Sequence, residues 1–271
     1  MTGGTLKMKK ILIALAAALM AFAVIGCSKK VEKGEFTIEK GVLKVGMEIG
    51  YPPMEYYDVD GKTPIGFDVE MGKLLAEKLG LKVEFVDTAW DGIFAGLETD
   101  KYDVVISAAT ITPERLESMD FSKPYIGNGQ AIILQKNSTL DVTKPEDLKD
   151  LTVAYQAETT SDYFMEKLAK DGLKFKPAEF DKVINAYDEL KLGRCDAVVS
   201  DALVSAAYLG PDSEYKKVWN GEADEFFGIA IKKGNSALTE KINSALEQLA
   251  SDGSLKEISE KIFNEDLIAV E

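Results

Sequence analysis

The sequence predicts an α/β protein whose sheets are largely parallel. Short apolar runs rich in β-branched residues, at 82–86 and 102–106, have the length and composition of buried strands. Between them, apolar residues recur at helical spacing from Phe67 to Leu79, and a shorter helix is expected from Gly92 to about Glu98. Strands that alternate with helices in this way are typical of sheets covered by helices.

The N-terminus has the composition of an export signal. Three lysines precede an uncharged run from Ile11 to Gly26, and Cys27 follows a small residue. A basic flank, an apolar stretch and a small residue before a break are typical of a secretory signal, and the run is marginally short for a spanning helix. We therefore expect residues 1–26 to be removed, and the charged residues 27–40 to form a linker.

Composition argues against several classes of function. The formal net charge is −14, whereas nucleic-acid backbones are bound by clustered Lys and Arg. The sequence contains no histidine, so the commonest general base and metal ligand is missing. It shows neither the ligand spacing of a zinc site nor a phosphate-binding loop. We expect no nucleic-acid partner, no metal and no cofactor.

Local signals place the elements of the first half. A first strand is expected from Gly41 to Val45, and two prolines directly after Tyr51 mark the loop beyond it. Asp60-Gly61 is typical of a turn. After the strand at 102–106, Thr112-Pro113-Glu114 has the pattern of a helix start, with Thr as the N-cap and Pro at the first helical position.

The second half continues the alternation. Strands are expected at 130–135, at 151–155 and in the apolar run that ends at Asp201. Helices are expected from Pro145, from a Thr or Ser cap at 159–161, from Asn185 to Leu192, over Leu203 to Leu209, and in amphipathic segments across 236–263.

Hydrogen-bond donors converge where the strand at 102–106 ends. Residues 107–112 supply hydroxyls and free backbone amides, and Arg115 falls in the first turn of the next helix. Such a set suits a carboxylate, because arginine binds both carboxylate oxygens at once. The alternative is that Arg115 is a surface residue in an ion pair.

A series of collinear motifs identifies a family resemblance. They are Gly66-Phe67-Asp68-Val69-Glu70, Trp90-Asp91-Gly92-Ile93, Lys101-Tyr102-Asp103, Thr110 to Arg115, Met119 to Tyr125, and Asp196 to Asp201. Over roughly Leu43 to Phe263 the chain resembles the polar amino-acid solute-binding proteins (family 3) of ABC importers. This implies a two-lobed type II periplasmic-binding (Venus-flytrap) fold, with a mostly parallel sheet flanked by helices in each lobe and two crossing strands as the hinge.

The resemblance also implies lobe boundaries and a mode of action. Lobe 1 would contain 41–128 and 226–271, lobe 2 would contain 129–225, and Glu225 to Ile231 would form the second crossing strand. A zwitterionic L-amino acid bound between the lobes would drive their closure, and a membrane permease would recognise the closed form. We expect a monomer.

The family's ligand contacts transfer to this chain residue by residue. The cleft would be lined by Glu48, Tyr51, Trp90 and Gln156; the ligand carboxylate would be bound by Ala108, Thr110 and Arg115 from one lobe and by Thr160 and Ser161 from the other; Asp201 would bind the α-ammonium group. Relatives usually have glycine where this chain has Glu158.

Each of these residues also has a purely structural interpretation. Tyr51 could pack beside the prolines, Trp90 could be a core residue, and Thr160 or Ser161 could simply cap a helix. Asp201 could cap the helix after its strand, a role compatible with ligand binding.

Side-chain polarity indicates the ligand class. An acid such as Glu48 beside aromatic side chains suits arginine or lysine, and glutamine could use the same polar groups. Val24-Ile25-Gly26-Cys27 resembles the lipoprotein cleavage box, which implies an acyl anchor at Cys27 and a position outside the cell membrane. Cys195 would then have no disulfide partner.

Two other function classes remain open. Enzymes resembling cyclohexadienyl dehydratase share the fold, and Glu158 or Glu48, buried on closure, could act as a general acid with a raised pKa. A sensory ligand-binding domain is the third interpretation, although no second long apolar run follows the domain.

Overall fold

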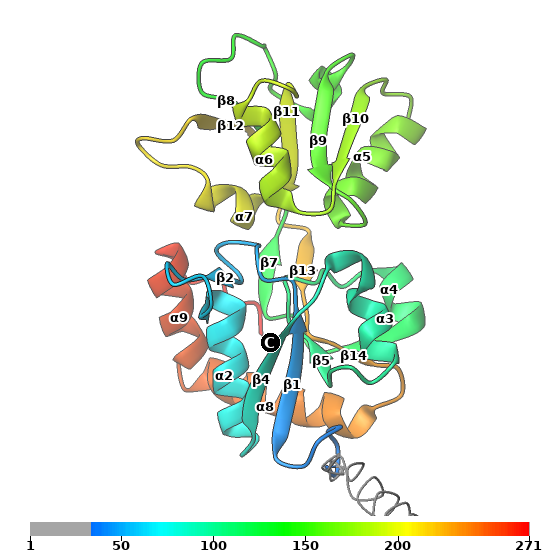
Figure 1. Ribbon diagram of the computed structural model, residues 1–271, viewed down its shortest axis with the longest axis vertical. Coiled ribbons are helices and arrows are strands. Elements are labelled where there is room, and N and C mark those ends of the chain that lie inside the picture. The colour runs from blue at the N-terminus through cyan, green and yellow to red at the C-terminus, as the bar shows by residue number, and fades with distance from the viewer. Residues whose placement is uncertain (1–33, 271) are drawn as a thin grey trace, which may run out of the picture. The chain divides into compact units, whose positions relative to one another are not determined.

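The computed structural model describes residues 34–270. The predicted signal segment, Cys27 and the start of the predicted linker therefore lie outside the described residues. Two five-stranded sheets form the framework, one in each half of Figure 1. Within residues 34–270, no helix has the length and apolar character needed to cross a membrane.

The first sheet has the strand order β4-β1-β5-β14-β6. Its strands are β1 Val42–Met47, β4 Lys82–Asp87, β5 Val104–Val105, β6 Met119–Phe121 and β14 Ala230–Lys232. Strand β1 pairs in parallel with β4 and β5, and β14 runs opposite to the other four strands. Helices α2 (Phe67–Lys78), α8 (Ser236–Ser251) and α9 (Ser254–Phe263) cover one side, and α3 (Ile93–Glu98) and α4 (Pro113–Ser118) cover the other (Figure 1).

The second sheet repeats this plan, with the order β10-β9-β11-β8-β12. Its strands are β8 Gln130–Gln135, β9 Thr152–Gln156, β10 Lys176–Phe180, β11 Ala197–Asp201 and β12 Tyr215–Asn220. Again only one strand, β8, runs against its neighbours. Helices α5 (Thr160–Lys170), α6 (Val183–Lys191) and α7 (Ala202–Ala207) and a 3-10 helix at Pro145–Leu148 complete this half.

Two short strands connect the halves. β7 (Ile126–Asn128) and β13 (Glu225–Phe227) pair antiparallel between the two sheets (Figure 1). The predicted two-lobed α/β fold is confirmed. The prediction of one crossing strand from Glu225 to Ile231 is wrong in detail, because β13 ends before Gly228 and β14 starts at Ala230. Gly228 packs so closely on Ile111 that an added Cβ would lie 2.7 Å from its side chain.

Local sequence signals correspond to the observed element ends. The Thr112 hydroxyl accepts a hydrogen bond from the backbone N–H of Arg115 at 3.2 Å, which caps α4 as predicted. Gly80 follows α2 with a φ of 67°, the left-handed conformation that favours glycine. The strand predicted at 102–106 is shorter than expected, although the predicted residues are buried.

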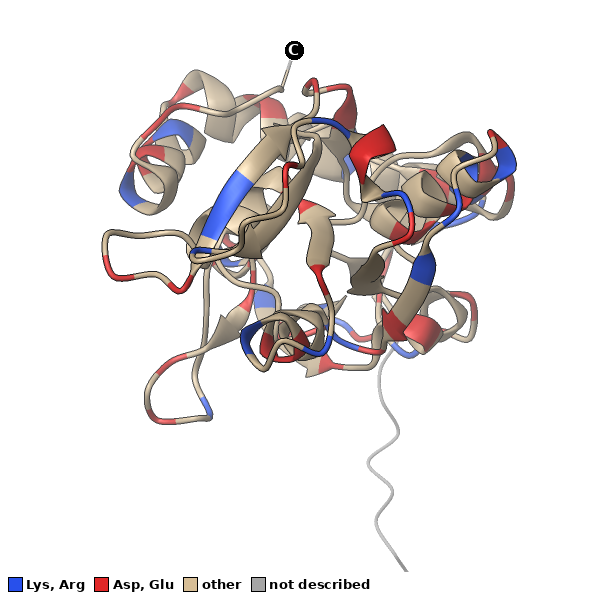
Figure 2. Ribbon diagram, turned by 90° about the horizontal axis from the view of Figure 1, so that it is seen from above, with Lys and Arg blue, Asp and Glu red and all other residues tan. Residues whose placement is uncertain are grey.

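Residues 34–40 contain no helix or strand, yet they are attached to the first sheet. The backbone N–H of Ile38 donates to Asp103 Oδ1 at 2.6 Å, and Thr37 is buried. Over the described chain, Lys and Arg are scattered among acidic residues and do not gather on one element (Figure 2).

Candidate functional site

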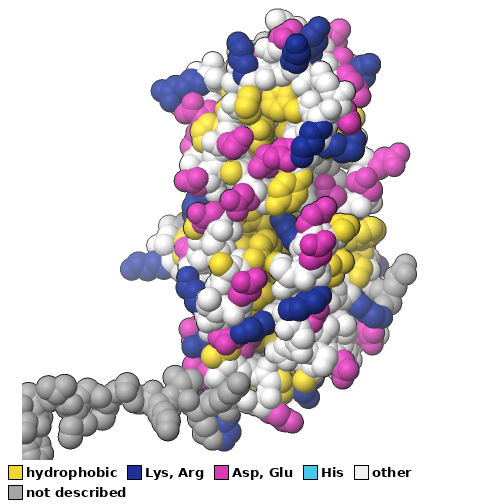
Figure 3. Space-filling model, turned by 90° about the vertical axis from the view of Figure 1, so that its right-hand side faces the viewer, with side chains coloured by type: hydrophobic (Ala, Val, Ile, Leu, Met, Phe, Trp, Pro, Cys, Tyr) yellow, Lys and Arg dark blue, Asp and Glu magenta, His cyan; other side chains and the backbone are white. Residues whose placement is uncertain are grey.

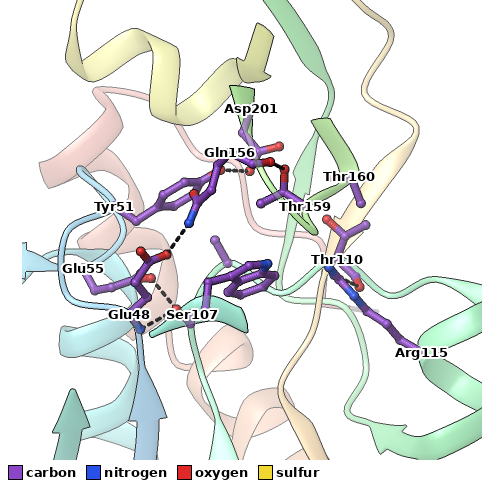
Figure 4. A pocket seen from close by; sticks show the side chains of 12 residues that line it. Glu48, Tyr51, Glu55, Ser107, Thr110, Arg115, Gln156, Thr159, Thr160 and Asp201 are labelled. Carbon is purple, nitrogen blue, oxygen red and sulfur yellow. Dashed lines mark hydrogen bonds between the residues drawn. The ribbon is translucent and has the colours of Figure 1, made fainter. Parts of the chain in front are cut away.

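A pocket lies between the two sheets (Figure 4). Its walls come from segments at or just beyond the carboxyl ends of β1, β5, β9 and β11, where α/β sheets commonly bind ligands. The lining residues are Glu48, Tyr51, Glu55, Trp90, Ser107, Ala108, Thr110, Arg115, Gln156, Thr159, Thr160 and Asp201.

Nine of the ten predicted contact residues line this pocket, and Ser161 does not. Ser161 is buried, and its hydroxyl donates to Gln130 Oε1 at 2.7 Å. Since α5 begins at Thr160, the next side chain along the helix is turned by about 100° from it. Sequence reasoning missed Glu55, whereas Ser107 and Thr159 belong to the two predicted donor stretches but were not among the ten contact residues.

Arg115 is a buried cation that forms no ion pair among residues 34–270. Its side chain is 6% exposed, and its guanidinium carbon lies 5.3 Å from the Trp90 ring centroid and 5.1 Å from that of Phe94. Nη1 donates to the Thr110 carbonyl at 2.9 Å. None of the ion pairs within residues 34–270 includes Arg115, so the predicted alternative of a surface ion pair is wrong. Burial lowers the pKa of this guanidinium.

Asp201 closes another side of the pocket. Its Oδ2 accepts from the Tyr51 hydroxyl at 2.7 Å, and its Oδ1 accepts from Asn128 Nδ2 at 2.8 Å and Gln130 Nε2 at 3.2 Å. Burial, together with the nearby Glu225 carboxylate, raises the pKa of Asp201. Asp201 stands at the N-cap position of α7, but its side chain makes no capping bond, so the capping prediction is wrong.

Two carboxyl groups form the acidic end of the pocket. Glu48 is 3% exposed, and its Oε2 accepts from Gln156 Nε2 at 2.7 Å. Burial raises the pKa of Glu48 to about 7, although the hydrogen bond from Gln156 acts in the opposite direction. Glu55 is fully buried and accepts from the Ser107 hydroxyl at 2.6 Å. Burial and the neighbouring Asp68 raise the pKa of Glu55 well above its ordinary value.

Glu158 adopts a backbone conformation that explains the glycine expected at this position. Its φ is 60°, in the left-handed region. Its carbonyl accepts from Trp90 Nε1 at 3.0 Å, while its side chain is exposed. The suggestion that Glu158 is a buried general acid is therefore not supported, and Glu48 is the buried acid of that pair.

Hydrogen bonds join the two halves across the pocket. Tyr51 to Asp201, Gln156 to Glu48, and Trp90 to the carbonyl of Glu158 each connect one half to the other. On the outer side, α3, α4 and α5 carry hydrophobic side chains among charged ones where the halves meet (Figure 3). A second hollow on this side is lined by Trp90, Phe94, Glu114, Arg115, Ser118, Met119, Glu158 and Tyr163.

Comparison with known protein families and curated relatives gives matches over most of the chain. A family model described as bacterial extracellular solute-binding proteins, family 3, matches residues 43–265. The L-cystine-binding protein TcyJ of Escherichia coli (strain K12) is 33% identical over 259 residues, covering 94% of this chain and 93% of TcyJ. The arginine-binding extracellular protein ArtP of Bacillus subtilis (strain 168) is 30% identical over 258 residues, covering 94% of this chain and 98% of ArtP.

Solved structures give the same picture. An ancestral arginine-binding protein bound to arginine is 44% identical with a TM-score of 0.78, covering 83% of this chain and 99% of its own. A structure of an ancestral arginine-binding protein bound to glutamine has the same TM-score and coverage at 43% identity. The ancestral amino acid-binding protein AncCDT-1, a precursor of cyclohexadienyl dehydratase, is 40% identical with a TM-score of 0.75, covering 82% of this chain and 96% of its own.

Proposed function

Because the chain belongs to the bacterial extracellular solute-binding proteins, family 3, we propose that it captures an L-amino acid and delivers it to the permease of an ABC importer. A basic or polar side chain, as in arginine, lysine or glutamine, suits the pocket best. The named relatives bind arginine and cystine, and the ancestral structures hold arginine and glutamine.

The observation that carries this proposal is the buried guanidinium of Arg115, which forms no ion pair within residues 34–270. An ion taken out of water is costly unless a counter-ion accompanies it, and no acidic residue among those described forms an ion pair with this guanidinium. A ligand carboxylate would supply the missing charge and accept two parallel hydrogen bonds. Asp201, on another wall of the same pocket, would then bind the α-ammonium group.

The acidic end of the pocket supports a basic ligand. Glu48 and Glu55 line it without a cationic partner in any ion pair within residues 34–270. A guanidinium or ammonium group would neutralise a carboxylate there, and the Trp90 indole offers a flat face for the aliphatic part of the side chain. For glutamine, Gln156 and Glu48 supply an amide and a carboxyl group as hydrogen-bond partners.

Lobe closure follows from the distribution of these contacts. We assign residues 41–128 and 226–271 to lobe 1 and residues 129–225 to lobe 2, which places Arg115 and Glu48 opposite Gln156 and Asp201. A ligand that contacts both lobes binds the closed form best, so it shifts the protein towards that form. Such hinge closure is the established behaviour of periplasmic binding proteins.

The proposed location follows from the N-terminus and the family. Family members are extracellular, and we propose that residues 1–26 direct export and that an acylated Cys27 anchors a monomeric protein at the membrane. Retention of the protein in the membrane fraction, and its release by Cys27→Ser, would test the anchor.

An enzyme is the second candidate, and one observation favours it. Glu48 is buried beside the pocket with a pKa of about 7, which suits a general acid, and AncCDT-1 is described as the precursor of an enzyme. A catalyst would convert the compound that it binds. Quantitative recovery of unchanged ligand from the saturated protein, measured by NMR, would support binding without chemistry.

Thermal unfolding with each of the twenty L-amino acids tests the main proposal. A ligand at about 1,000 times its dissociation constant adds about 4 kcal/mol to the stability of the folded state, which raises the melting temperature measurably. A response to one amino acid or a few related ones is expected. No response to any of them would overturn the proposal.

Arg115→Met tests the role of the charge, because it keeps much of the side-chain volume and removes only the guanidinium. The variant should lose the ligand response, while the ligand-free protein should unfold at the same or a higher temperature since a buried charge that forms no ion pair within residues 34–270 is gone. A full ligand response in this variant would contradict the role of Arg115.

A further inference from the structure

A carboxylate that is not among the lining residues of the pocket contacts two hydroxyls that are. Glu225, in the crossing strand β13, accepts hydrogen bonds at Oε2 from Thr110 Oγ1 at 3.2 Å and from Thr160 Oγ1 at 2.8 Å. The two threonines come from opposite lobes, so Glu225 lies where their hydroxyls converge (Figure 4 shows both threonines).

These two bonds fix the direction in which each hydroxyl can act. A threonine hydroxyl has one proton and two lone pairs, and a carboxylate is only an acceptor. When Thr110 and Thr160 donate their protons to Glu225, only oxygen lone pairs are left for a ligand. Gln130 Nε2 also lies 3.3 Å from Thr160 Oγ1, but its two protons are taken by the shorter contacts with Glu225 and Asp201, so the lone pairs of Thr160 remain available.

Hydroxyls held in this way suit a donor on the ligand. We propose that Glu225 is a positioning residue that presents Thr110 and Thr160 as acceptors for the α-ammonium group, so that the site prefers amino acids to the corresponding deaminated acids. This inference rests on the proposed function and refines it. The carboxylate of the ligand is then bound by Arg115 and by backbone amides. The threonine hydroxyls bind the α-ammonium group of the ligand together with Asp201.

Surrounding contacts hold Glu225 in this role. Gln130 donates from Nε2 to Glu225 Oε1 at 2.7 Å and to Asp201 Oδ1 at 3.2 Å. The orientation of this amide is fixed because its Oε1 accepts from the Ser161 hydroxyl at 2.7 Å. Gln130 therefore presents its NH2 group to both carboxylates, and Ser161 serves the site from outside the pocket.

Glu225→Gln changes the chemistry with little change in shape. If the new amide turns its NH2 group to the threonines, their hydroxyls become acceptors from it and their protons point elsewhere. If it turns its oxygen to the threonines, its NH2 group faces the NH2 group of Gln130. The second orientation sets two donor groups against each other, so the first is favoured, and in the first the arrangement that suits an ammonium group is lost.

The test is the ratio of two affinities, measured by titration calorimetry with the full chain. The probes are L-arginine and its deaminated counterpart, which lacks only the α-amino group, with L-glutamine and its deaminated counterpart as a second pair. We expect Glu225→Gln to lower the preference for the amino acid at least about tenfold, the effect of losing one hydrogen bond to a charged group. Glu222→Gln is the control, because it removes the same charge from an exposed position nearby and should leave the ratio unchanged.

The ratio separates this role from a structural one. If Glu225 only holds the lobes together, both members of a pair weaken equally, and an unchanged ratio overturns the inference while the proposed function stands. A wild-type protein that binds neither amino acid overturns both. Should Glu225→Gln fail to fold, Thr110→Val decides, because loss of one acceptor must lower the same ratio, and an unchanged ratio again overturns the inference.

Discussion

Lowering the pH from 8 to 5 should weaken the binding of L-arginine far more than that of L-glutamine. Burial raises the pKa of Glu48 from 4.5 to about 7, so its carboxyl group is ionised above that pH and neutral below it. A cationic side chain is attracted only by the ionised form. Affinity should therefore be full above pH 7 and fall about tenfold per pH unit below it, which gives a loss of about 100-fold at pH 5.

The comparison with glutamine isolates Glu48 from the rest of the pocket. Both ligands have the same α-ammonium and α-carboxylate groups, so changes at Asp201 and Arg115 cancel in the ratio of their dissociation constants. Titration calorimetry at pH 8, 7, 6 and 5 would give this ratio directly. Glu48→Gln, which is close in shape and does not ionise, should make it independent of pH.

Two results would refute this reasoning. An arginine-to-glutamine ratio that stays constant from pH 8 to pH 5 would mean that the cationic group does not depend on an acid of this pKa. A ratio that changes in Glu48→Gln as it does in the wild type would assign the titration to another group, such as Glu55, which lines the same pocket.

Two further predictions concern the backbone and the contact between the lobes. Glu158→Gly should raise the free energy of unfolding by up to about 1 kcal/mol and the melting temperature by about 2–4 °C, because glycine adopts a positive φ without strain. Ligand affinity should not change, since Trp90 donates to the backbone carbonyl of residue 158. A lower melting temperature would contradict the argument. Tyr51→Phe removes the hydroxyl bond to Asp201 between the lobes and should cost the closed form about 1–3 kcal/mol. Small-angle X-ray scattering of the ligand-free variant should give a larger radius of gyration, and an unchanged radius would show that this bond does not hold the lobes.

The fold could be predicted where the chain signals its own local structure. Thr112-Pro113 marks the start of α4 because the cap and the fixed φ of proline act within one turn. β10 and β12 were not predicted, because these edge strands are partly exposed and lack a continuous apolar run. Glu225 to Ile231 was predicted as one strand because its apolar composition is continuous, and the close approach of the distant Ile111 to Gly228 cannot be read from the sequence.

The site was predictable only as far as the family motifs reach. Nine of ten expected residues surround one pocket, but Glu55 joins it through a hydrogen bond to a residue 52 positions away. Sequence reasoning could not assign Asp201 its partners in place of a helix cap, because Tyr51 is 150 positions away. Thr160 and Ser161 are the first two residues of α5, and only Thr160 faces the pocket. The sequence does not show at which of these neighbouring residues the helix begins.

The order of the strands has a consequence for how the chain assembles. β14 lies between β5 and β6, so the first sheet stays incomplete until residues 230–232 have been synthesised. All five strands of the second sheet lie in one continuous segment, 130–220, and a ribosome that makes about 5–20 residues per second completes them first. Asn128 and Glu225 face each other in the β7–β13 ladder. A two-residue turn joining them would close a hairpin, remove the second sheet and leave every strand of the first in place. The N-terminal and C-terminal parts of the chain therefore form a host into which the second sheet is inserted as one continuous segment.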